Sequence, residues 1–168
     1  MANSTLTSTE ITNLVAELEF HKYLVSVSIN GGTATVLGPL KTAPKCEGDV
    51  ETKDTTIYET GSEVQASILS KNNVRLTLET ENVDTAITLL AGFSKGDNVL
   101  ATAQKTTITL VPITSDATAK TITFTNAYLQ PGLSTDFQDA DDPNSVTLVY
   151  ICKADASTGK PYTFAVQS

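Results

Sequence analysis

The stretch that decides the fold reads Asp49-Val50-Glu51-Thr52-Lys53-Asp54-Thr55-Thr56-Ile57-Tyr58, then Glu59-Thr60-Gly61, then an extended run over residues 62–70. Its β-branched residues favour two strands, and the glycine marks the turn between them. Few of these residues are apolar, so the strands cannot bury a face inside a small domain. The unpaired edge of such a strand promotes aggregation unless another chain pairs with it. The stretch therefore predicts a long polar β-hairpin that contacts another chain.

Strand-forming residues continue on both sides of this hairpin. The chain has 168 residues, is 40% hydrophobic and 6% aromatic, and contains no Trp. A chain of this length can form one hydrophobic core without metal or disulfide support. Further strands are expected at residues 23–29, 33–37, 74–80, 99–103, 106–111, 121–128, 145–154 and 162–166. We therefore expect a mainly β protein that forms a single domain over residues 1–168.

Two helices are expected to accompany the strands. Thr7-Ser8-Thr9-Glu10 has the pattern of a capping box, and apolar residues follow at helical spacing, namely Ile11, Leu14, Val15 and Leu18. This pattern predicts a flanking N-terminal helix over residues 8–20, preceded by a flexible N-terminus at residues 1–7. A second, short helix is predicted at Val83–Ala91, because Asn82 can cap its start and Gly92 can end it.

The segment just before the hairpin, residues 38–48, is expected to be a long exposed loop. Its two prolines lack the backbone N–H that a helix or a central strand needs, and a glycine stands at each end. Together, residues 38–70 are expected to form a loop and hairpin for intersubunit contact. The candidate residues of the loop are Pro39, Leu40, Lys41, Pro44 and Lys45.

The sequence contains no pattern typical of an active site. The single histidine, His21, has no partner residues for a metal site, and the acidic run at 136–144 lacks the Gly and Glu positions of an EF-hand. Residues 154–161 lack the first Gly and the final Ser or Thr of a phosphate loop, so we interpret them as a hairpin turn. Cys46 and Cys152 are far apart and are expected to be free thiols. We predict no enzymatic activity, no metal and no cofactor.

The charge of the chain argues against two classes of partner. Lys and Arg number 11 and Asp and Glu number 19, which gives a net charge of −8. A protein that grips nucleic acid or an anionic membrane needs an excess of basic residues. The N-terminus has no pattern of a secretion signal, and no apolar run approaches the length of a membrane span. We therefore expect synthesis in the cytoplasm and no membrane anchor.

The order of these features resembles the tail-tube proteins, or major tail proteins, of long-tailed bacteriophages. The similarity extends over about residues 36–164, and its motifs are patterns of strand and turn residues. The segments that resemble the family are residues 48–61, 74–84, 89–92, 124–132, 146–150 and 155–160.

The resemblance implies a β-sandwich or barrel-like core with a flanking helix, in a virion protein that forms hexameric rings. The rings stack into a tail tube through which genomic DNA is ejected. In that family a long hairpin joins the strands of neighbouring subunits around the lumen, and the carboxylates at the matching positions here are candidates for lumen or ring-edge charges. These are Asp49, Glu51, Asp54, Glu59 and Glu63.

The same resemblance implies particular partners and a location. The partners would be further copies of the chain and the tape-measure, tail-tip and tail-terminator proteins, all within the tail of the virion. DNA would pass through without specific binding, because like charges repel the phosphates.

Two other functions are compatible with a β-rich sequence. The main alternative is an immunoglobulin-like β-sandwich that serves as a decoration or binding module on a virion or cell surface. A hydrolase that uses Asp139 and Asp141 would need a paired carboxylate signature, which the sequence lacks. Electron microscopy separates the tail-tube function from the binding module, because a tube protein forms rings or tubes and a binding module stays monomeric.

Overall fold

The computed structural model describes residues 22–56, 64–115, 117–136 and 144–166. They form one eight-stranded sheet in which every pairing is antiparallel, together with an α-helix and a 3-10 turn, so the prediction of a mainly β protein is confirmed. The helix α2 spans Val83–Ala91, as predicted. The expected N-terminal helix at 8–20 and the N-terminus at 1–7 lie outside the described residues. The strands are β1 Lys22–Ile29, β2 Thr35–Val36, β3 Lys45–Thr56, β4 Val64–Thr80, β5 Thr106–Ile113, β6 Lys120–Asp136, β7 Ser145–Cys152 and β8 Thr163–Val166, and the 3-10 turn η2 is Thr102–Gln104.

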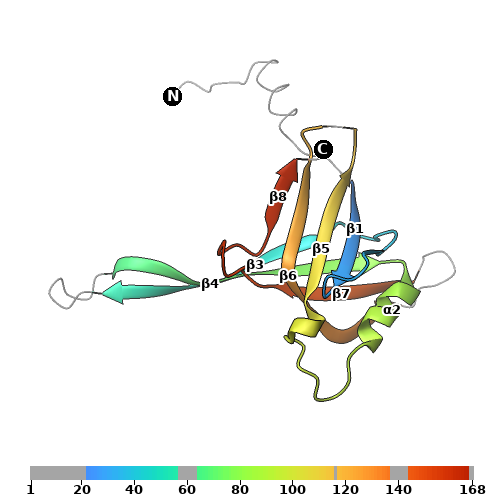
Figure 1. The fold of residues 1–168 in the computed structure, drawn as a ribbon, viewed down its shortest axis with the longest axis horizontal. Helices are drawn as coiled ribbons and strands as arrows, with labels where there is room; N and C mark the ends of the chain where they lie inside the picture. The colour runs from blue at the N-terminus through green and yellow to red at the C-terminus, as the bar shows by residue number, and fades with distance from the viewer. Residues whose placement is uncertain (1–21, 57–63, 116, 137–143, 167–168) are drawn as a thin grey trace, which may run out of the picture.

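The long strand β6 belongs to both halves of this sheet. Its first half pairs with β5 and with β8, and its second half, from Ala127 onward, pairs with β7. Figure 1 shows the result, in which β1, β5, β6 and β8 run steeply while β3, β4 and β7 cross them. We call the first set, with β2, the first half-sheet, and the set of β3, β4, β7 and the end of β6 the second half-sheet.

The hydrophobic core fills the angle between the two half-sheets. Buried residues alternate with half-buried ones along β5 and, from Val146 onward, along β7, which turns one face of each strand inward, as a period of two requires. The helix α2 packs against β6 and β7 and adds Ala86 to the core. The core residues are Val25, Val27, Leu37, Val74, Leu76, Leu78, Ala86, Ile108, Leu110, Phe124, Ala127, Leu129, Val146, Leu148, Tyr150 and Cys152.

Two of the sequence-based expectations for strands and turns are wrong. Residues 99–103 were expected to form a strand, but they form turns and part of η2. The reason is local, because Asp97 accepts a hydrogen bond from the Ser94 amide at 2.7 Å and Asn98 accepts one from the Leu100 amide at 3.0 Å. Residues 154–161 do form a turn, but not a hairpin turn, since β7 and β8 each pair with β6 and not with each other.

The strand β6 extends beyond residue 128, where the strand expected from the sequence ends, and it contains a bulge at Pro131-Gly132. The strand β6 continues through these residues, and its register with β7 shifts between Gln130 and Ser134. Proline has no N–H to donate to a ladder, and a bulge accommodates it without ending the strand.

No helix in the described part of the chain is long and apolar enough to cross a membrane.

Candidate assembly surface

The β3–β4 hairpin extends beyond the rest of the domain. Residues 74–80 of β4 pair with β7 on one edge, and residues 74–77 also pair with β3 on the other. Farther out, β4 pairs only with β3 among the described strands, and Figure 1 shows this part of the hairpin projecting to one side. A two-stranded ribbon of this kind is at best marginally stable in water. The outer hairpin is therefore the part of the described chain that gains most from contact with another molecule.

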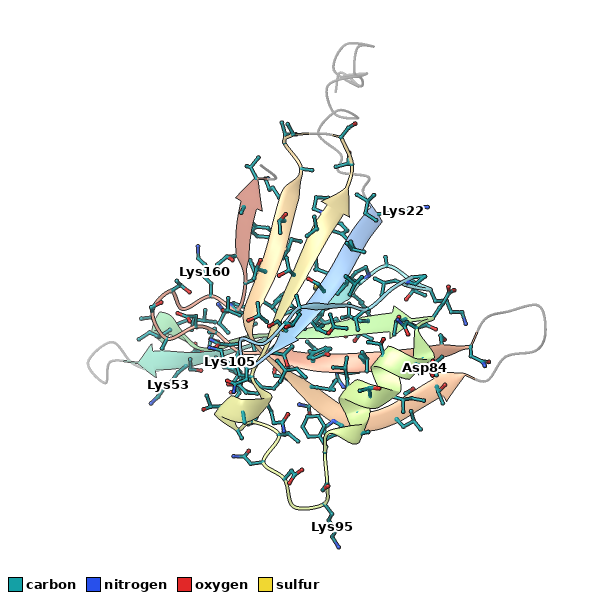
Figure 2. All side chains as sticks on the ribbon, turned by 45° about the vertical axis from the view of Figure 1, so that its right-hand side comes forward. Lys22, Lys53, Asp84, Lys95, Lys105 and Lys160 are labelled. Atoms are coloured by element: carbon teal, nitrogen blue, oxygen red, sulfur yellow. The ribbon has the colours of Figure 1, made fainter. Side chains whose placement is uncertain are left out.

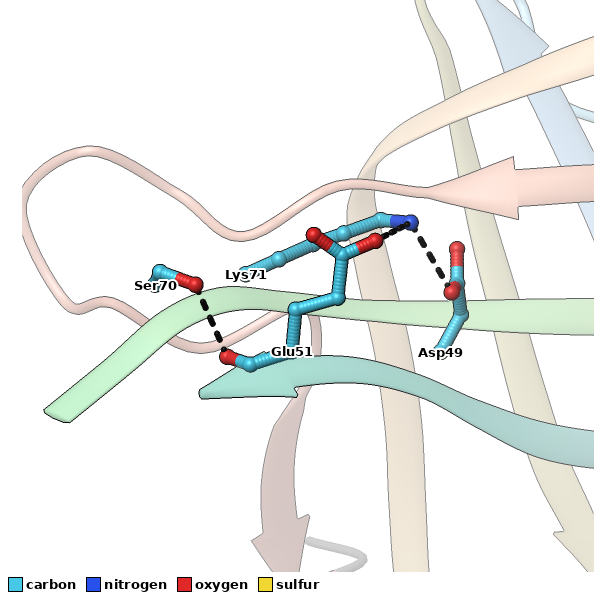
Figure 3. Close-up of polar contacts among 4 residues, drawn as sticks. All are labelled: Asp49, Glu51, Ser70 and Lys71. Atoms are coloured by element: carbon cyan, nitrogen blue, oxygen red, sulfur yellow. Dashed lines mark hydrogen bonds and ion pairs between the residues drawn. The ribbon is translucent and has the colours of Figure 1, made fainter. Parts of the chain in front are cut away.

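A single lysine links two of the candidate carboxylates of the hairpin. Lys71 Nζ lies 2.9 Å from Asp49 Oδ1 and 3.2 Å from Glu51 Oε1 (Figure 3). These two hydrogen bonds raise the pKa of Lys71 above its ordinary value. Ser70 also donates to the Glu51 carbonyl at 3.1 Å, beside the register shift that follows Glu51. Asp49 and Glu51 thus share one positive charge, so this cluster has a net charge of about −1.

The other candidate carboxylates of the hairpin are separate from this cluster. Asp54 accepts a hydrogen bond from Ser67 Oγ at 2.5 Å across the two strands. Asp54 lies three residues after Glu51 on β3, and this odd spacing turns the two side chains toward opposite faces. Glu59 and Glu63 lie outside the described residues. The candidates therefore do not form one acidic face.

Exposed apolar side chains on the hairpin escaped the sequence analysis, which treated this segment as polar. The exposed fractions are 56% for Val50, 61% for Ile68 and 52% for Leu69. Apolar residues grouped on a projecting element are typical of an interaction surface. The adjacent pair Ile68-Leu69 was the signal in the sequence, since two neighbouring residues of a strand face opposite sides and only one of them can face a core.

The loop before the hairpin is shorter and better anchored than expected. It ends at Pro44, because Lys45 already belongs to β3 and pairs with Thr77. The loop follows the edge of β4, where the Lys41 amide donates to the Glu79 carbonyl and the Glu81 amide donates to the Pro39 carbonyl, both at 2.9 Å. The expectation of an exposed loop over residues 38–48 is therefore correct in kind for residues 38–44, which are partly exposed, and wrong for residues 45–48, which belong to β3.

Side chains strengthen this anchoring. The buried Thr80 hydroxyl donates to the Leu37 carbonyl at 2.7 Å and to the Pro39 carbonyl at 3.2 Å. Lys41 Nζ lies 3.7 Å from Glu79 Oε1. Of the five candidate loop residues, Pro39 and Lys45 are exposed, whereas Leu40, Lys41 and Pro44 are half-buried. Lys45 pairs with Glu47 at 2.9 Å and lowers the pKa of that carboxyl.

A groove of about 830 Å³ lies between this loop and the first half of β1. Its apolar side chains are Leu24, Leu40, Leu110, Ile113 and Ile122. The two half-sheets stay open at this edge, because the short strand β2 covers only Ser26 and Val27 of β1.

The described residues offer little for catalysis. They contain no group of three or more His, Cys, Asp or Glu side chains that could hold a metal ion. Cys46 is exposed and Cys152 is buried, and both are free thiols. Burial, with a smaller contribution from Cys46, raises the pKa of Cys152 to about 12, so this thiol is a poor nucleophile. His21, Asp139 and Asp141 lie outside the described residues.

The fold is similar to that of chains in contractile injection systems. One neighbour is a chain in the cryo-EM structure of the anti-feeding prophage cap, the tube-terminating cap, with a TM-score of 0.57 and 11% identity over 90% of this chain and 93% of that one. Another is a chain in the sheath–tube complex of the extracellular contractile injection system PVC in its extended state, with a TM-score of 0.57 and 13% identity over 96% and 100% of the two chains. A chain in the sheath/tube terminator of the PVC system has a TM-score of 0.51 and 16% identity over 90% and 99%. No protein-family model matches the sequence, and no curated protein sequence matches it either. At these identities the likeness concerns the fold.

Proposed function

We propose that this protein is a structural subunit of a phage tail, which polymerises as stacked hexameric rings into a tail tube. The observation that supports this most directly is the projecting β3–β4 hairpin. Its Val50, Ile68 and Leu69 side chains are more than half exposed, and a monomer gains nothing by keeping them in water. The likeness of the fold to chains of tube, cap and terminator assemblies points the same way.

The edge of the sheet offers a way to join subunits. The strand order ends at β3, so its outer edge is open to a strand from a neighbouring copy. Pairing at this edge would give the outer hairpin the backbone partners that an isolated ribbon lacks. The candidate loop residues, from Pro39 to Lys45, lie on the same border of β4 and would meet the same neighbour.

The tube would serve as a negatively charged conduit for DNA. The net charge of −8 per chain, repeated around a ring, repels phosphate and prevents specific binding. Because Lys71 offsets part of the charge of Asp49 and Glu51, we infer that this repulsion comes from the whole subunit more than from the hairpin carboxylates alone. The further partners would be tape-measure, tail-tip and tail-terminator proteins, and the place of action would be the tail of the virion.

The immunoglobulin-like binding module is the weaker alternative. Immunoglobulin domains consist of two separate sheets, whereas the strands here follow one path, β2-β1-β5-β6-β7-β4-β3, with β8 added to β6. No described feature favours a carbohydrate or protein ligand over a neighbouring copy.

Negative-stain electron microscopy of the purified protein tests the proposal. We expect rings or tubes of constant width in the wild type and their loss in Ile68→Asp. The matched control is Ile87→Asp, which places the same substitution on an exposed residue of α2, outside the hairpin. A wild-type protein that stays a compact monomer at high concentration would contradict the proposal, as would normal tubes from Ile68→Asp.

A further inference from the structure

The apolar groove beside β1 is open to solvent in the part of the chain that the structure describes. Leu24 and Ile113, on its walls, are 41% and 63% exposed. Leu24 lies near the start of β1, where it pairs with Val111 of β5. Ile113 lies at the end of β5, where it pairs with Lys22, the first residue of β1. Exposed apolar walls around a groove are typical of a site that another segment covers.

The segment that precedes β1 has the chemistry to cover this groove. The described chain starts at Lys22, which itself lines the groove and stands at the end of β1 in Figure 2. Residues 1–21 are therefore joined to the described chain at a residue that lines the groove. Their apolar residues recur at helical spacing and make a single stripe, which consists of Ile11, Leu14, Val15 and Leu18.

The charges of the two surfaces are complementary. Residues 1–21 contain three carboxylates, Glu10, Glu17 and Glu19, and no Lys or Arg. The charged residues that line the groove are Lys22 and Lys41, which are both positive. Because Lys41 Nζ lies 3.7 Å from Glu79 Oε1, Lys22 carries most of this local positive charge, which favours an acidic partner.

We propose that residues 8–20 form an amphipathic helix that places its apolar stripe in the groove of the same subunit. The helix closes the open edge between the two half-sheets and covers the 38–44 loop from the side of β1. This inference concerns the subunit itself and stands whether or not the chain forms tubes. It gives the acidic N-terminal segment a structural task, which is to complete the core where β2 is too short to do so.

Crosslinking in the full-length protein tests this placement. The native thiol of Cys46 is exposed and lines the groove, whereas Cys152 is buried. We expect Leu14→Cys, treated with a short bis-maleimide, to form an intramolecular link to Cys46 several-fold faster than Asn13→Cys, which lies on the opposite face of the predicted helix. Equal rates at the two positions would overturn the proposal. Links that form only between two molecules would also overturn it, because they would place the segment in the groove of a second copy.

Hydrogen exchange gives an independent readout. The Lys41 amide, which donates to the Glu79 carbonyl, reports on the loop wall of the groove. We expect Leu14→Asp to raise its exchange about ten-fold, equivalent to roughly 1.4 kcal/mol, and Asn13→Asp to leave it unchanged. Ile113→Asp should have the same effect as Leu14→Asp. Because the Ile113 side chain is exposed, we expect this variant to keep its fold, which circular dichroism checks. Unchanged exchange in both Leu14→Asp and Ile113→Asp would refute the docking.

Discussion

Replacing the buried hydroxyl of Thr80 tests how firmly the 38–44 loop is held. The Thr80 side chain is fully buried, donates to the carbonyls of Leu37 and Pro39, and accepts a hydrogen bond from the Asn82 amide at 3.0 Å. Thr80→Val keeps the shape of the side chain but removes all three contacts. The hydroxyl has one proton, which the two carbonyls share, and it accepts one further hydrogen bond, so at about 1 kcal/mol for each bond we expect the free energy of unfolding to fall by about 2 kcal/mol. For a domain of this size, that lowers Tm by about 4 to 8 °C.

Urea unfolding followed by circular dichroism measures this loss, and Tyr150→Phe is the matched control. The Tyr150 hydroxyl is buried and has no hydrogen-bond partner among the described residues, so its removal should leave the stability unchanged or raise it by about 1 kcal/mol. The two variants remove the same group from the same core with opposite expected results. A loss of less than about 0.5 kcal/mol in Thr80→Val would refute the anchoring described above, because that is within the range of ordinary surface substitutions.

Three further outcomes follow from the hairpin and the thiols. In the monomer, the amides of residues 66–69 should exchange faster than those of Val74–Thr80, and equal protection in a hydrogen-exchange experiment would contradict the view that β7 stabilises only the inner part of β4. The pKa of Lys71 is raised in the folded hairpin, so its contribution to the stability of the hairpin is complete at neutral pH and is lost as the pH rises through the raised pKa. Hydrogen exchange of the hairpin amides should show this loss at alkaline pH in the wild type and not in Lys71→Met. A thiol reagent at pH 8 should modify Cys46 in the native protein and Cys152 only after unfolding, and equal rates for both would contradict the burial of Cys152.

Local patterns predicted the elements whose cause is local. The helix at Val83–Ala91 was found because Asn82 and Gly92 mark its ends, and the Asn82 side chain does accept from the Thr85 amide at 3.3 Å. The strands from 106 and from 145 were found because their alternation reflects a single buried face. In both cases the residues that make the signal are also the residues that make the structure.

Apart from residues 99–103, where local hydrogen bonds of Asp97 and Asn98 favour turns, the parts that were predicted wrongly depend on contacts between distant residues. Nothing near Pro131 indicates that β7 will hold β6 extended on both sides of a bulge. Likewise, the anchoring of the 38–44 loop depends on Thr80, some forty positions away, and a threonine inside a strand gives no sign of such a role. For the candidate assembly surface, the sequence indicated the hairpin but not the link of Lys71 to Asp49 and Glu51, because that link requires the register of the two strands.

The continuity of β6 through both half-sheets determines how a pulling force would travel through the subunit. A load applied along the outer hairpin enters β4 and passes to β7 through the ladder at Val74–Thr80. Antiparallel hydrogen bonds are perpendicular to the strands, so this load acts on the whole ladder in shear and is shared among its bonds. It then reaches β6, where the bulge at Pro131-Gly132 interrupts the ladder with β7 and leaves a compliant point. Stretching along the hairpin would therefore strain the subunit first at this bulge, while the first half-sheet keeps its shape.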